Sequence, residues 1–420
     1  METIKKYLND DTVYNKMNMF ISLRSSSHEA TINEQLQLIL QQLIPAMKSQ
    51  SPLFKQTYQR TAYTGSYFKK TRVGAPEEFD LNLIIKLPLK DKDFEKFTTD
   101  RPGFTVVRIR QGTDILKALK SDDKAYREMK SFIDQDLYLN QDKFRSWMEG
   151  VLGKVADQTN NRIVLEELPY PVLIKRKSGP AFTLSFKLND FENYIDIDLV
   201  PALAFSMCNP PPEFKFRNYT SIRYWYAIPK PLYNSSWFSP HHHWRLSFYE
   251  LEKDLLDEYS TANRMKSIIR HLKKFRDTQN LSNIASYYIE ILCLHEQDFF
   301  RNSRESYTYL FFTMLQKLCH AFENGKINFY WVDAVNLLEG MNGHEIRNIY
   351  GKLNNILKKI ERNIKTDKFA IAEYVLPADE LSMLRSHLSS NNINYQEMVN
   401  EFANEQIDEQ NGNQGTCVII

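Results

Sequence analysis

The chain has 420 residues, the length of one large domain or of two closely packed domains. Hydrophobic residues make up 42% of it and charged residues 25%, which is the balance of an ordinary globular protein. Because the formal net charge is only +2, the overall charge does not indicate an anionic partner. Any basic surface must come from local clustering.

Cysteine spacing and the first residues indicate where the protein works. The four cysteines lie far apart, which argues against a disulfide framework and against a cysteine-rich zinc site. The start, METIKKYLND, lacks the apolar stretch of a signal peptide, and Glu2 rules out N-myristoylation. No segment approaches the ~20 apolar residues of a membrane span. We therefore expect a reducing, cytoplasmic setting.

The first predicted element is a long helix. Residues 1–30 are mixed and polar, whereas apolar residues recur at helical spacing from Ile32 to Met47. Pro45 is expected to disturb this helix near its end.

A mixed series of strands and helices follows through residue 205. A loop rich in Thr, Tyr, Gly and Ser occupies residues 61–78, and the apolar run FDLNLIIKLPL after it is typical of a buried strand. Helical patterns lie around residues 113–150. Further strands are predicted at 104–110, 172–177, 181–188 and 193–203.

Proline clusters at 209–212 and 229–231 mark a connector, after which the pattern changes. From Trp244 to about residue 390 the chain is predicted to be almost wholly helical. Residues 390–416 are rich in Asn, Gln and Glu, which indicates a flexible tail.

Two pairs of carboxylates carry the strongest chemical signal. Glu78 and Asp80 lie two residues apart in a strand pattern and share one face, as do Asp196 and Asp198 in a second strand. Such carboxylates repel each other unless a cation neutralises them, and their hard oxygens suit Mg²⁺ or Mn²⁺. With a third carboxylate from the second strand, the first pair predicts a two-metal site that aligns a hydroxyl and a triphosphate for in-line displacement. A solvated acidic pair is the alternative.

Gly65 and Ser66 precede Glu78 in the same loop. Glycine allows backbone amides to approach phosphate oxygens closely, and the serine hydroxyl adds another donor. Together with the carboxylates, this pair predicts a metal-dependent nucleotidyltransferase.

The segment TGSYFKKTRVGAPEEFDLNLIIKLP resembles the active-site segment of cyclic GMP-AMP synthase and its animal relatives, the cGAS-like receptors. IDLVPAL is similar to the family's strand with the third carboxylate, which implies Asp198 as a metal ligand and leaves Asp196, on the same face, as the alternative. Keeping all three carboxylates argues against a pseudoenzyme. The family's Gly-Ser pair and E-x-D motif correspond to Gly65, Ser66, Glu78 and Asp80.

The resemblance continues downstream. HWRLSFYELEK resembles the segment that lines the acceptor-nucleotide pocket, NRMKSIIRHLKK a segment with a phosphate-binding lysine, and IASYY a Ser-Tyr pair whose ring stacks on a base. Tyr249 stands where the vertebrate enzyme has a serine, which leaves the nucleotide order and linkage open. The implied nucleotide contacts are Arg245, Ser247, Glu252, Lys266, Ser286 and Tyr287.

One departure from the vertebrate DNA sensor concerns the activator. Its zinc thumb of one histidine and closely spaced cysteines follows the WRLSF segment, but this chain has no cysteine between Cys208 and Cys293. We therefore expect no zinc. The thumbless insect members are more similar to this chain, and those with an assigned ligand respond to double-stranded RNA, which the resemblance therefore implies as the activator.

The resemblance also implies an α+β, bilobed nucleotidyltransferase fold with a twisted mixed sheet, a long N-terminal spine helix and a C-terminal helical lobe. The expected domains are a core lobe (1–215), a helical lobe that closes the nucleotide cleft (216–390) and a flexible tail (391–420). The implied activity is that of an innate immune, antiviral sensor that makes cyclic GMP-AMP from ATP and GTP with Mg²⁺ or Mn²⁺. A downstream receptor would bind the product.

A basic helix is the candidate surface for nucleic acid. In residues 261–277 apolar residues form one stripe, and basic residues fill the remaining arc, where like charges repel unless an anion covers them. Recognition would rest on phosphates, 2′-hydroxyls and duplex shape. A solvated helix face is the alternative. The candidate contacts are Arg264, Arg270, Lys273, Lys274 and Arg276.

Other basic residues are candidates to extend this surface or to link it to the catalytic loop. An N-terminal group would enlarge the patch, and a loop group would connect ligand binding to loop ordering. The two groups are Lys5, Lys6, Lys16 and Arg24, and Lys69, Lys70 and Arg72.

Two short motifs each allow a functional and a non-functional interpretation. His241, His242 and His243 are consecutive, and neighbours in an extended segment face opposite sides, so a polar loop is favoured over a metal site. Cys417 begins a C-terminal CaaX pattern, typical of prenylation, although the terminal Ile420 is an uncommon choice. One lipid would attach the chain to membranes only weakly, and an unmodified cysteine is the alternative.

Two other functions remain open on the same residues. A template-free RNA nucleotidyltransferase or polymerase would share the carboxylates, and its product would be an extended strand. A non-catalytic scaffold would bind only nucleotide or RNA and would keep its biological activity after Asp80→Ala.

Overall fold

The computed structural model describes residues 2–21, 27–74, 78–156, 161–175, 179–188, 194–215, 223–232, 237–258 and 261–389. Its strands form a single ten-stranded sheet with parallel and antiparallel pairs. The strands are β1 (Tyr58–Tyr63), β2 (Glu78–Ile85), β3 (Phe94–Phe97), β4 (Phe104–Ile109), β5 (Arg162–Ile163), β6 (Val172–Ile174), β7 (Phe182–Phe186), β8 (Ile195–Ser206), β9 (Tyr224–Ile228) and β10 (His243–Ser247).

Helices precede the sheet, interrupt it and follow it. Those of the first half are α1 (Glu2–Lys5), α2 (Thr12–Ile21), α3 (Ser27–Gln50), α4 (Pro52–Thr57), α5 (Gly65–Phe68), α6 (Ile115–Ala118), α7 (Asp123–Lys130) and α8 (Gln141–Gly153). Those of the second half are α9 (Tyr249–Leu256), α10 (Ala262–Thr278), α11 (Ser286–His295), α12 (Gln297–Asn302), α13 (Tyr307–Glu323), α14 (Gly343–Asn363), α15 (Ala372–Val375) and α16 (Ala378–Ser389).

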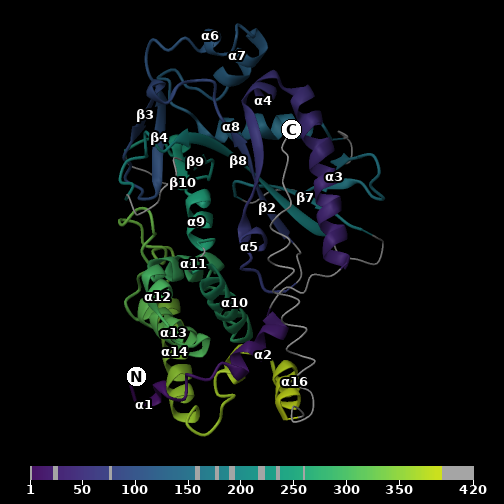
Figure 1. Ribbon diagram of the computed structural model, residues 1–420. Coiled ribbons are helices and arrows are strands. Elements are labelled where there is room, and N and C mark those ends of the chain that lie inside the picture. Colours follow the sequence, from purple (N-terminus) through teal and green to yellow (C-terminus); the bar gives the residue numbers. More distant parts are fainter. Residues whose placement is uncertain are drawn as a thin grey trace.

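Figure 1 shows the sheet toward one end of the molecule, with the long helix α3 beside it and helices α10 to α14 gathered at the other end. The chain is therefore α+β with a mixed sheet and a helical C-terminal region, which confirms the predicted fold class.

Strand β8 organises the sheet. Its residues 195–199 pair antiparallel with β7, its residues 196–203 pair parallel with β2, and its residues 203–206 pair antiparallel with β9. The sheet then continues from β9 through β10 and β4 to β3, while β1 pairs with β2. Both acidic strands of the sequence, β2 and β8, are thus direct neighbours.

Helix α3 has the apolar stripe that the sequence predicted. Ile32, Leu36, Ile39 and Leu43 are at most 2% exposed, and each lies three or four residues from the next. Pro45 does not end the helix, which continues past the proline to Gln50. This helix takes the place predicted for the spine.

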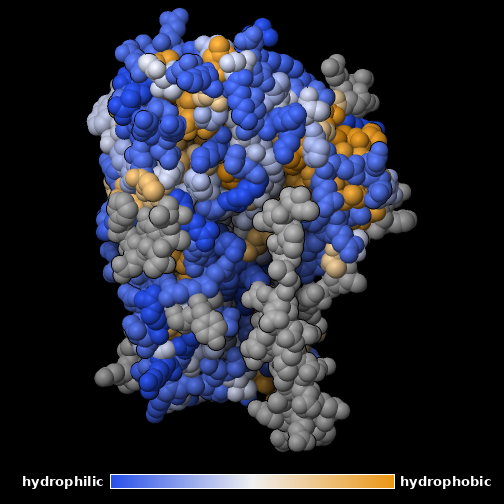
Figure 2. All heavy atoms as spheres, turned by 45° about the horizontal axis from the view of Figure 1, so that its top comes forward, coloured by the Kyte–Doolittle hydropathy of each residue, from blue (hydrophilic) through white to orange (hydrophobic). Residues whose placement is uncertain are grey.

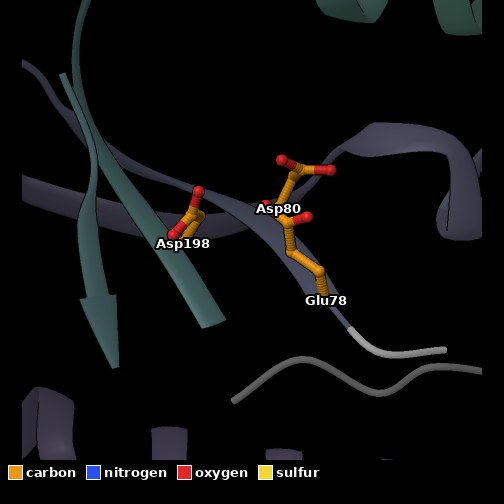
Figure 3. Close-up of side chains that lie close together, drawn as sticks. All are labelled: Glu78, Asp80 and Asp198. Carbon is orange, nitrogen blue, oxygen red and sulfur yellow. The ribbon is translucent and has the colours of Figure 1, made fainter. Parts of the chain in front are cut away.

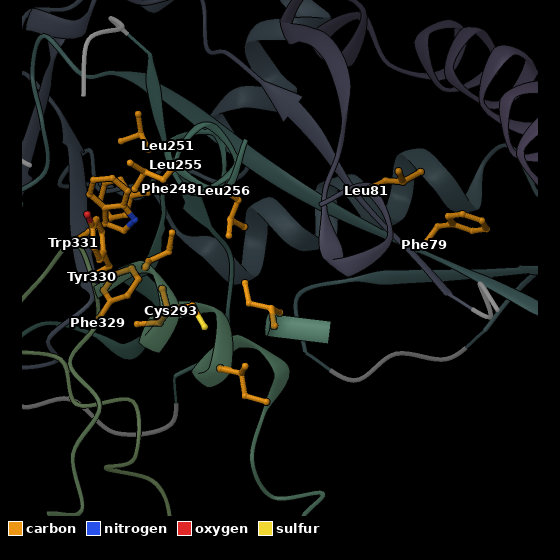
Figure 4. Packing of buried hydrophobic residues seen from close by; sticks show 14 of the residues in the cluster. Phe79, Leu81, Phe248, Leu251, Leu255, Leu256, Cys293, Phe329, Tyr330 and Trp331 are labelled. Carbon is orange, nitrogen blue, oxygen red and sulfur yellow. The ribbon is translucent and has the colours of Figure 1, made fainter. Parts of the chain in front are cut away.

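The hydrophobic core is continuous from the sheet to the C-terminal helices. Phe79 and Leu81 are fully buried on one face of β2, and Phe248, Cys293 and Trp331 belong to the same cluster (Figure 4). Since residues of a strand alternate in direction, the apolar face of β2 leaves Glu78 and Asp80 on the opposite face.

Several local predictions were wrong in detail. The segment 61–78, expected as a loop, contains the end of β1 and the short helix α5, and helices α1 and α2 lie within the mixed, polar first 30 residues. β1 escaped notice because it is mostly half-exposed and polar. The region after Trp244 is mainly helical, but it begins inside β10.

The expected border between the two lobes, at residues 215 and 216, falls within the sheet. Strands β9 and β10 come after it in the chain and pair with β8 and β4. The proline cluster at 209–212 therefore precedes two further strands rather than ending the sheet.

The face seen in Figure 2 is largely hydrophilic, with smaller apolar areas between the polar ones. Within the described part of the chain, no helix combines the length and the apolar character needed to cross a bilayer. The predicted tail and Cys417 lie outside the described residues.

Candidate active site

The carboxylates converge because of the register between β2 and β8. These strands are parallel, with Asp80 opposite Asp198 and Glu78 opposite Asp196. Each strand alternates buried apolar residues with more exposed polar ones, so all four carboxylates lie on the face that turns away from the core.

Three of these carboxylates form a cluster (Figure 3). Glu78, Asp80 and Asp198 each present an oxygen atom, and these atoms lie within 4.8 Å of one another. Carboxylate oxygens at this spacing suit a divalent cation such as Mg²⁺ or Mn²⁺. The chain therefore has a possible acidic metal-binding triad.

The electrostatics of the cluster also fit a cation. Desolvation and then the charges of Asp80 and Asp198 raise the pKa of Glu78 to about 7. Desolvation and the charge of Asp198 likewise raise the pKa of Asp80, although Lys69 and Arg72 oppose this rise. A bound metal ion would offset the repulsion that raises the pKa values of Glu78 and Asp80.

The structure distinguishes Asp198 from Asp196, between which the sequence left a choice. Asp196 is engaged elsewhere, because Lys175 Nζ lies 2.7 Å and 2.9 Å from its two carboxylate oxygens and Ser185 donates a hydrogen bond to it. Asp198 accepts a 2.6 Å hydrogen bond from Thr183 and otherwise faces Glu78 and Asp80. Asp198 is thus the member of the pair that lies in the carboxylate cluster.

The Gly65-Ser66 loop lies directly against the cluster. Gly65 has a φ of +74°, and a Cβ at this position would lie 1.9 Å from Asp80 Oδ2, so only glycine fits. The backbone amide and the hydroxyl of Thr64 both donate to the Asp80 carbonyl oxygen over 2.9 Å. The loop is therefore fixed to the strand that carries two of the three carboxylates.

Three residues expected to contact nucleotide lie close together. Tyr287 donates a 2.7 Å hydrogen bond to Glu252. Burial raises the pKa of the Tyr287 hydroxyl well above its usual value, the Glu252 charge adds to the rise, and the charge of nearby Arg245 opposes it. Among the described residues, the Arg245 side chain has no hydrogen-bond or ion-pair partner, which leaves its guanidinium available to an anion.

The other three expected nucleotide contacts are placed differently. Lys266 is 9% exposed and forms an ion pair with Asp257. Ser286 accepts a 2.8 Å hydrogen bond from Arg276 at the start of α11. Ser247 is half-buried at the end of β10.

Helix α10 turns only part of its predicted basic arc to solvent. None of its five candidate nucleic-acid contacts is fully exposed, and Lys273 is only 2% exposed. The anions that the sequence argument required come from the chain itself, as Glu290 for Lys273 and Glu380 for Lys274. Arg264, Arg270 and Arg276 instead donate hydrogen bonds to backbone carbonyl oxygens.

The accessory basic residues are also mostly engaged. Lys5 pairs with Glu305 over 2.6 Å, and Lys16 is 8% exposed. Lys6 lies over the Tyr7 ring, and Arg72 donates to the Glu78 carbonyl oxygen over 2.9 Å. Arg24 lies outside the described residues.

The three consecutive histidines point to three different carboxylates. His241 contacts Asp142, His242 contacts Asp134 over 2.8 Å, and His243 lies 3.5 Å from Asp100. The expected polar loop is partly wrong, because His243 is fully buried in β10.

Sequence reasoning missed Glu290, which is buried beside the catalytic loop. Its carboxylate lies 3.1 Å from Lys69 Nζ and 2.7 Å from Lys273 Nζ. A signal was present, because Glu290 is the one acidic residue in the otherwise apolar and aromatic stretch that forms α11. A charge in such a stretch requires a buried partner.

Comparisons with known proteins agree with this geometry. Residues 67–258 match the model of the Mab-21 protein nucleotidyltransferase domain, and residues 264–355 match that of the Mab-21 protein HhH/H2TH-like domain. The first match includes all three clustered carboxylates. The protein is therefore a nucleotidyltransferase.

Curated relatives make the assignment more specific. A cyclic GMP-AMP synthase-like receptor of Microplitis demolitor is 35% identical over 395 residues, which cover 91% of this chain and 71% of the relative. One of Trichogramma pretiosum is 34% identical over 404 residues, covering 93% and 81%. Cyclic GMP-AMP synthase-like receptor 1 of Drosophila melanogaster is 26% identical, covering 72% and 79%. The chain belongs to the cyclic GMP-AMP synthase-like receptor family.

Proposed function

We propose that this protein is a cytoplasmic innate immune sensor that makes cyclic GMP-AMP from ATP and GTP when double-stranded RNA binds to it. The observation that carries the proposal is the convergence of Glu78, Asp80 and Asp198 within 4.8 Å, directly beside the Gly65-Ser66 loop. Nucleotidyl transfer needs both parts, because one neutralises developing charge and the other holds phosphate.

In this proposal the carboxylates hold Mg²⁺ or Mn²⁺. When bound, these ions would neutralise phosphate charge and lower the pKa of the attacking ribose hydroxyl. The chain's own part is to place the phosphates, through the Gly65 and Ser66 loop, and to exclude water from the reacting groups.

The expected nucleotide contacts are kept as part of the proposal, with Arg245 best supported. Its guanidinium has no partner among the described residues, and it lies near Tyr287, whose hydroxyl is hydrogen-bonded to Glu252. A phosphate or a base edge that binds there would supply the partner that the Arg245 guanidinium lacks. Lys266 and Ser286 would contact the nucleotide after giving up their present partners, Asp257 and Arg276. Ser247 would contact it from the end of β10.

Double-stranded RNA is proposed as the activator, and the missing zinc thumb supports it. The five candidates on α10 remain part of the proposal, and because they are buried or half-buried, we add helix α14 as a more exposed surface for RNA contact. The exposed charged residues of α14 are all basic, while its two glutamates, Glu345 and Glu361, are half-buried. The exposed basic residues of α14 are Arg347, Lys352, Lys358, Lys359 and Arg362.

The lobes and the terminus complete the proposal. We place the border between the sheet lobe and the helical lobe after α9, because β9 and β10 belong to the sheet. Weak membrane attachment through a prenylated Cys417 remains a proposal that intact mass of the protein from native cells tests.

Activation is tested with the purified full-length chain, labelled ATP and GTP, Mg²⁺ or Mn²⁺, and duplexes of one sequence in RNA or in DNA. A phosphatase-resistant dinucleotide formed only with the RNA duplex supports the proposal. Equal product with DNA, or without any duplex, contradicts the RNA-activation step. An extended strand would instead identify a template-free transferase.

A further inference from the structure

A buried ionic network lies outside the carboxylate cluster. Lys69, Glu290 and Lys273 have side chains that are 10%, 7% and 3% exposed. Glu290 Oε2 lies 3.1 Å from Lys69 Nζ, and its Oε1 lies 2.7 Å from Lys273 Nζ. Two cations on separate segments therefore share one carboxylate.

Such a network is a poor source of stability. Removing charges from water costs about as much as their attraction returns, and apolar residues of similar size would often serve a core equally well. A buried charge network that also fixes one arrangement of its surroundings is better explained by what it positions.

The buried ionic network holds the segment that follows the Gly65-Ser66 loop. The Thr71 hydroxyl donates to Glu290 over 2.9 Å and accepts from Lys273 over 3.1 Å. The Thr71 backbone amide in turn donates to the Ser66 carbonyl oxygen over 2.9 Å. A displacement of Glu290 would therefore reach Ser66 through two hydrogen bonds.

Two further contacts connect the same segment. The Lys69 amide donates to the Gly65 carbonyl oxygen over 3.2 Å, so the side chain that binds Glu290 belongs to a residue bonded to the loop glycine. Arg270 of α10 donates to the Lys70 carbonyl oxygen over 2.8 Å. Helices α10 and α11 thus hold residues 69, 70 and 71 from one side.

We propose that Glu290 is a positioning residue that couples helices α10 and α11 to the Gly65-Ser66 loop. The position of these two helices then sets the distance between the loop and Asp80. The inference rests on the proposed function for its purpose, but the coupling itself is a property of the chain that is measured without turnover.

The network also reaches the expected nucleotide contacts. Lys69 Nζ lies 3.5 Å from Glu252, which accepts the hydrogen bond of Tyr287, and 5.9 Å from the centroid of the Tyr287 ring. One lysine is therefore shared by the loop-holding carboxylate and by a carboxylate of the nucleotide site. Occupancy of that site and the position of the loop are linked through Lys69.

Removal of one charge or of a whole pair tests the coupling. Glu290→Gln leaves Lys273 buried without a carboxylate, and Lys273→Met leaves Glu290 with Lys69 alone, whereas the double variant removes both charges and leaves Lys69 beside Glu252. Hydrogen exchange of the amides in residues 64–74 of the full-length chain is the main measurement. We expect at least tenfold faster exchange in each single variant and a return to within threefold of wild type in the double variant.

A neighbouring ion pair supplies the control. Lys274 follows Lys273 on α10, but its partner at 2.8 Å is Glu380 of α16, away from the loop. Glu380→Gln should leave exchange in residues 64–74 unchanged. Thr71→Val keeps the ion pairs and removes only the hydroxyl, so it should speed loop exchange even if a charge variant is poorly folded.

The outcomes separate this inference from the proposed function. Wild-type exchange in the two single variants and in Thr71→Val overturns the coupling, as does equal acceleration over the whole chain. Selective loop acceleration with rescue supports it even if the wild-type chain makes no dinucleotide, a result that would overturn only the proposed function. With an active wild type, the single variants should lose at least tenfold in kcat while nucleotide KM changes less than threefold.

Discussion

Gly65 lies against the carboxylate of Asp80 so closely that no side chain fits between them. A Cβ at Gly65 would be 1.9 Å from Asp80 Oδ2, and the Thr64 residue before it is hydrogen-bonded to the Asp80 carbonyl oxygen. The loop expected to bind phosphate and the strand expected to bind metal are therefore parts of one site, and the geometry of one fixes the other.

Gly65→Ala should reduce turnover by roughly 100-fold, the cost of a displacement of about 1 Å in an active site. The new methyl group would displace Asp80, and the φ of +74° adds strain. Steady-state kinetics measures the loss. Gly74→Ala is a matched control, because Gly74 has a φ of +79° but no atom near its Cβ position. Equal losses in both variants would show that backbone strain alone is responsible.

Asp198→Asn should stabilise the metal-free protein, because it removes a charge that disfavours the ionised forms of Glu78 and Asp80. The same change should abolish the rise in melting temperature that Mn²⁺ causes in wild type. Thermal unfolding with and without Mn²⁺ measures both effects. Asp196→Asn is the control, since Asp196 pairs with Lys175, and it should keep the response to Mn²⁺. A normal Mn²⁺ response in the Asp198 variant would contradict the assignment.

Glu290 should contribute to acid stability. Although burial opposes it, the charges of Lys69 and Lys273 hold its pKa at about 2, below its usual value of 4.5. A lowered carboxyl pKa gives stability that is full above the unfolded pKa and is lost as the pH falls from about 4.5 toward 2. Unfolding free energies of wild type and Glu290→Gln should therefore converge over this interval. Parallel curves would contradict the pairing.

Charge reversal on α14 should weaken RNA binding. We expect lower RNA affinity in a triple variant with Lys358→Glu, Lys359→Glu and Arg362→Glu. The slope of log K against log salt concentration should become shallower by roughly 0.9 for each lost phosphate contact. Fluorescence anisotropy at several salt concentrations measures both. Lys117→Glu with Lys124→Glu, on exposed positions of the first half of the chain, is the control. Similar losses in both sets would indicate only a general effect of charge.

The sequence predicted those features that depend on local pattern. The stripe of α3 and the alternation in β2 and β8 follow from side-chain periodicity, so the shared face of Glu78 and Asp80 was predictable. The pairing of β2 with β8 is not local, since it brings together residues more than a hundred positions apart. The assignment of Asp198 to the same site as Asp80 therefore came from the resemblance to a family and not from periodicity.

Features that depend on tertiary partners were not predictable. The basic residues of α10 looked like a surface because their counter-charges, Glu290 and Glu380, lie on other helices. Likewise, Asp196 and Asp198 share one face of a strand pattern, and only the structure shows that Lys175 and Ser185 engage Asp196 while Asp198 lies opposite Asp80. Amphipathic pattern identifies a buried stripe, but it does not show which charged residues a second layer of helices will cover.

The most direct test of the account is mass spectrometry of the nuclease-treated product formed from ATP and GTP in the presence of a long RNA duplex and Mg²⁺. We expect a cyclic dinucleotide that contains one adenosine and one guanosine, formed by the wild-type chain and absent with Asp80→Asn. An extended RNA strand, or a dinucleotide formed equally well by the Asp80→Asn variant, would contradict it.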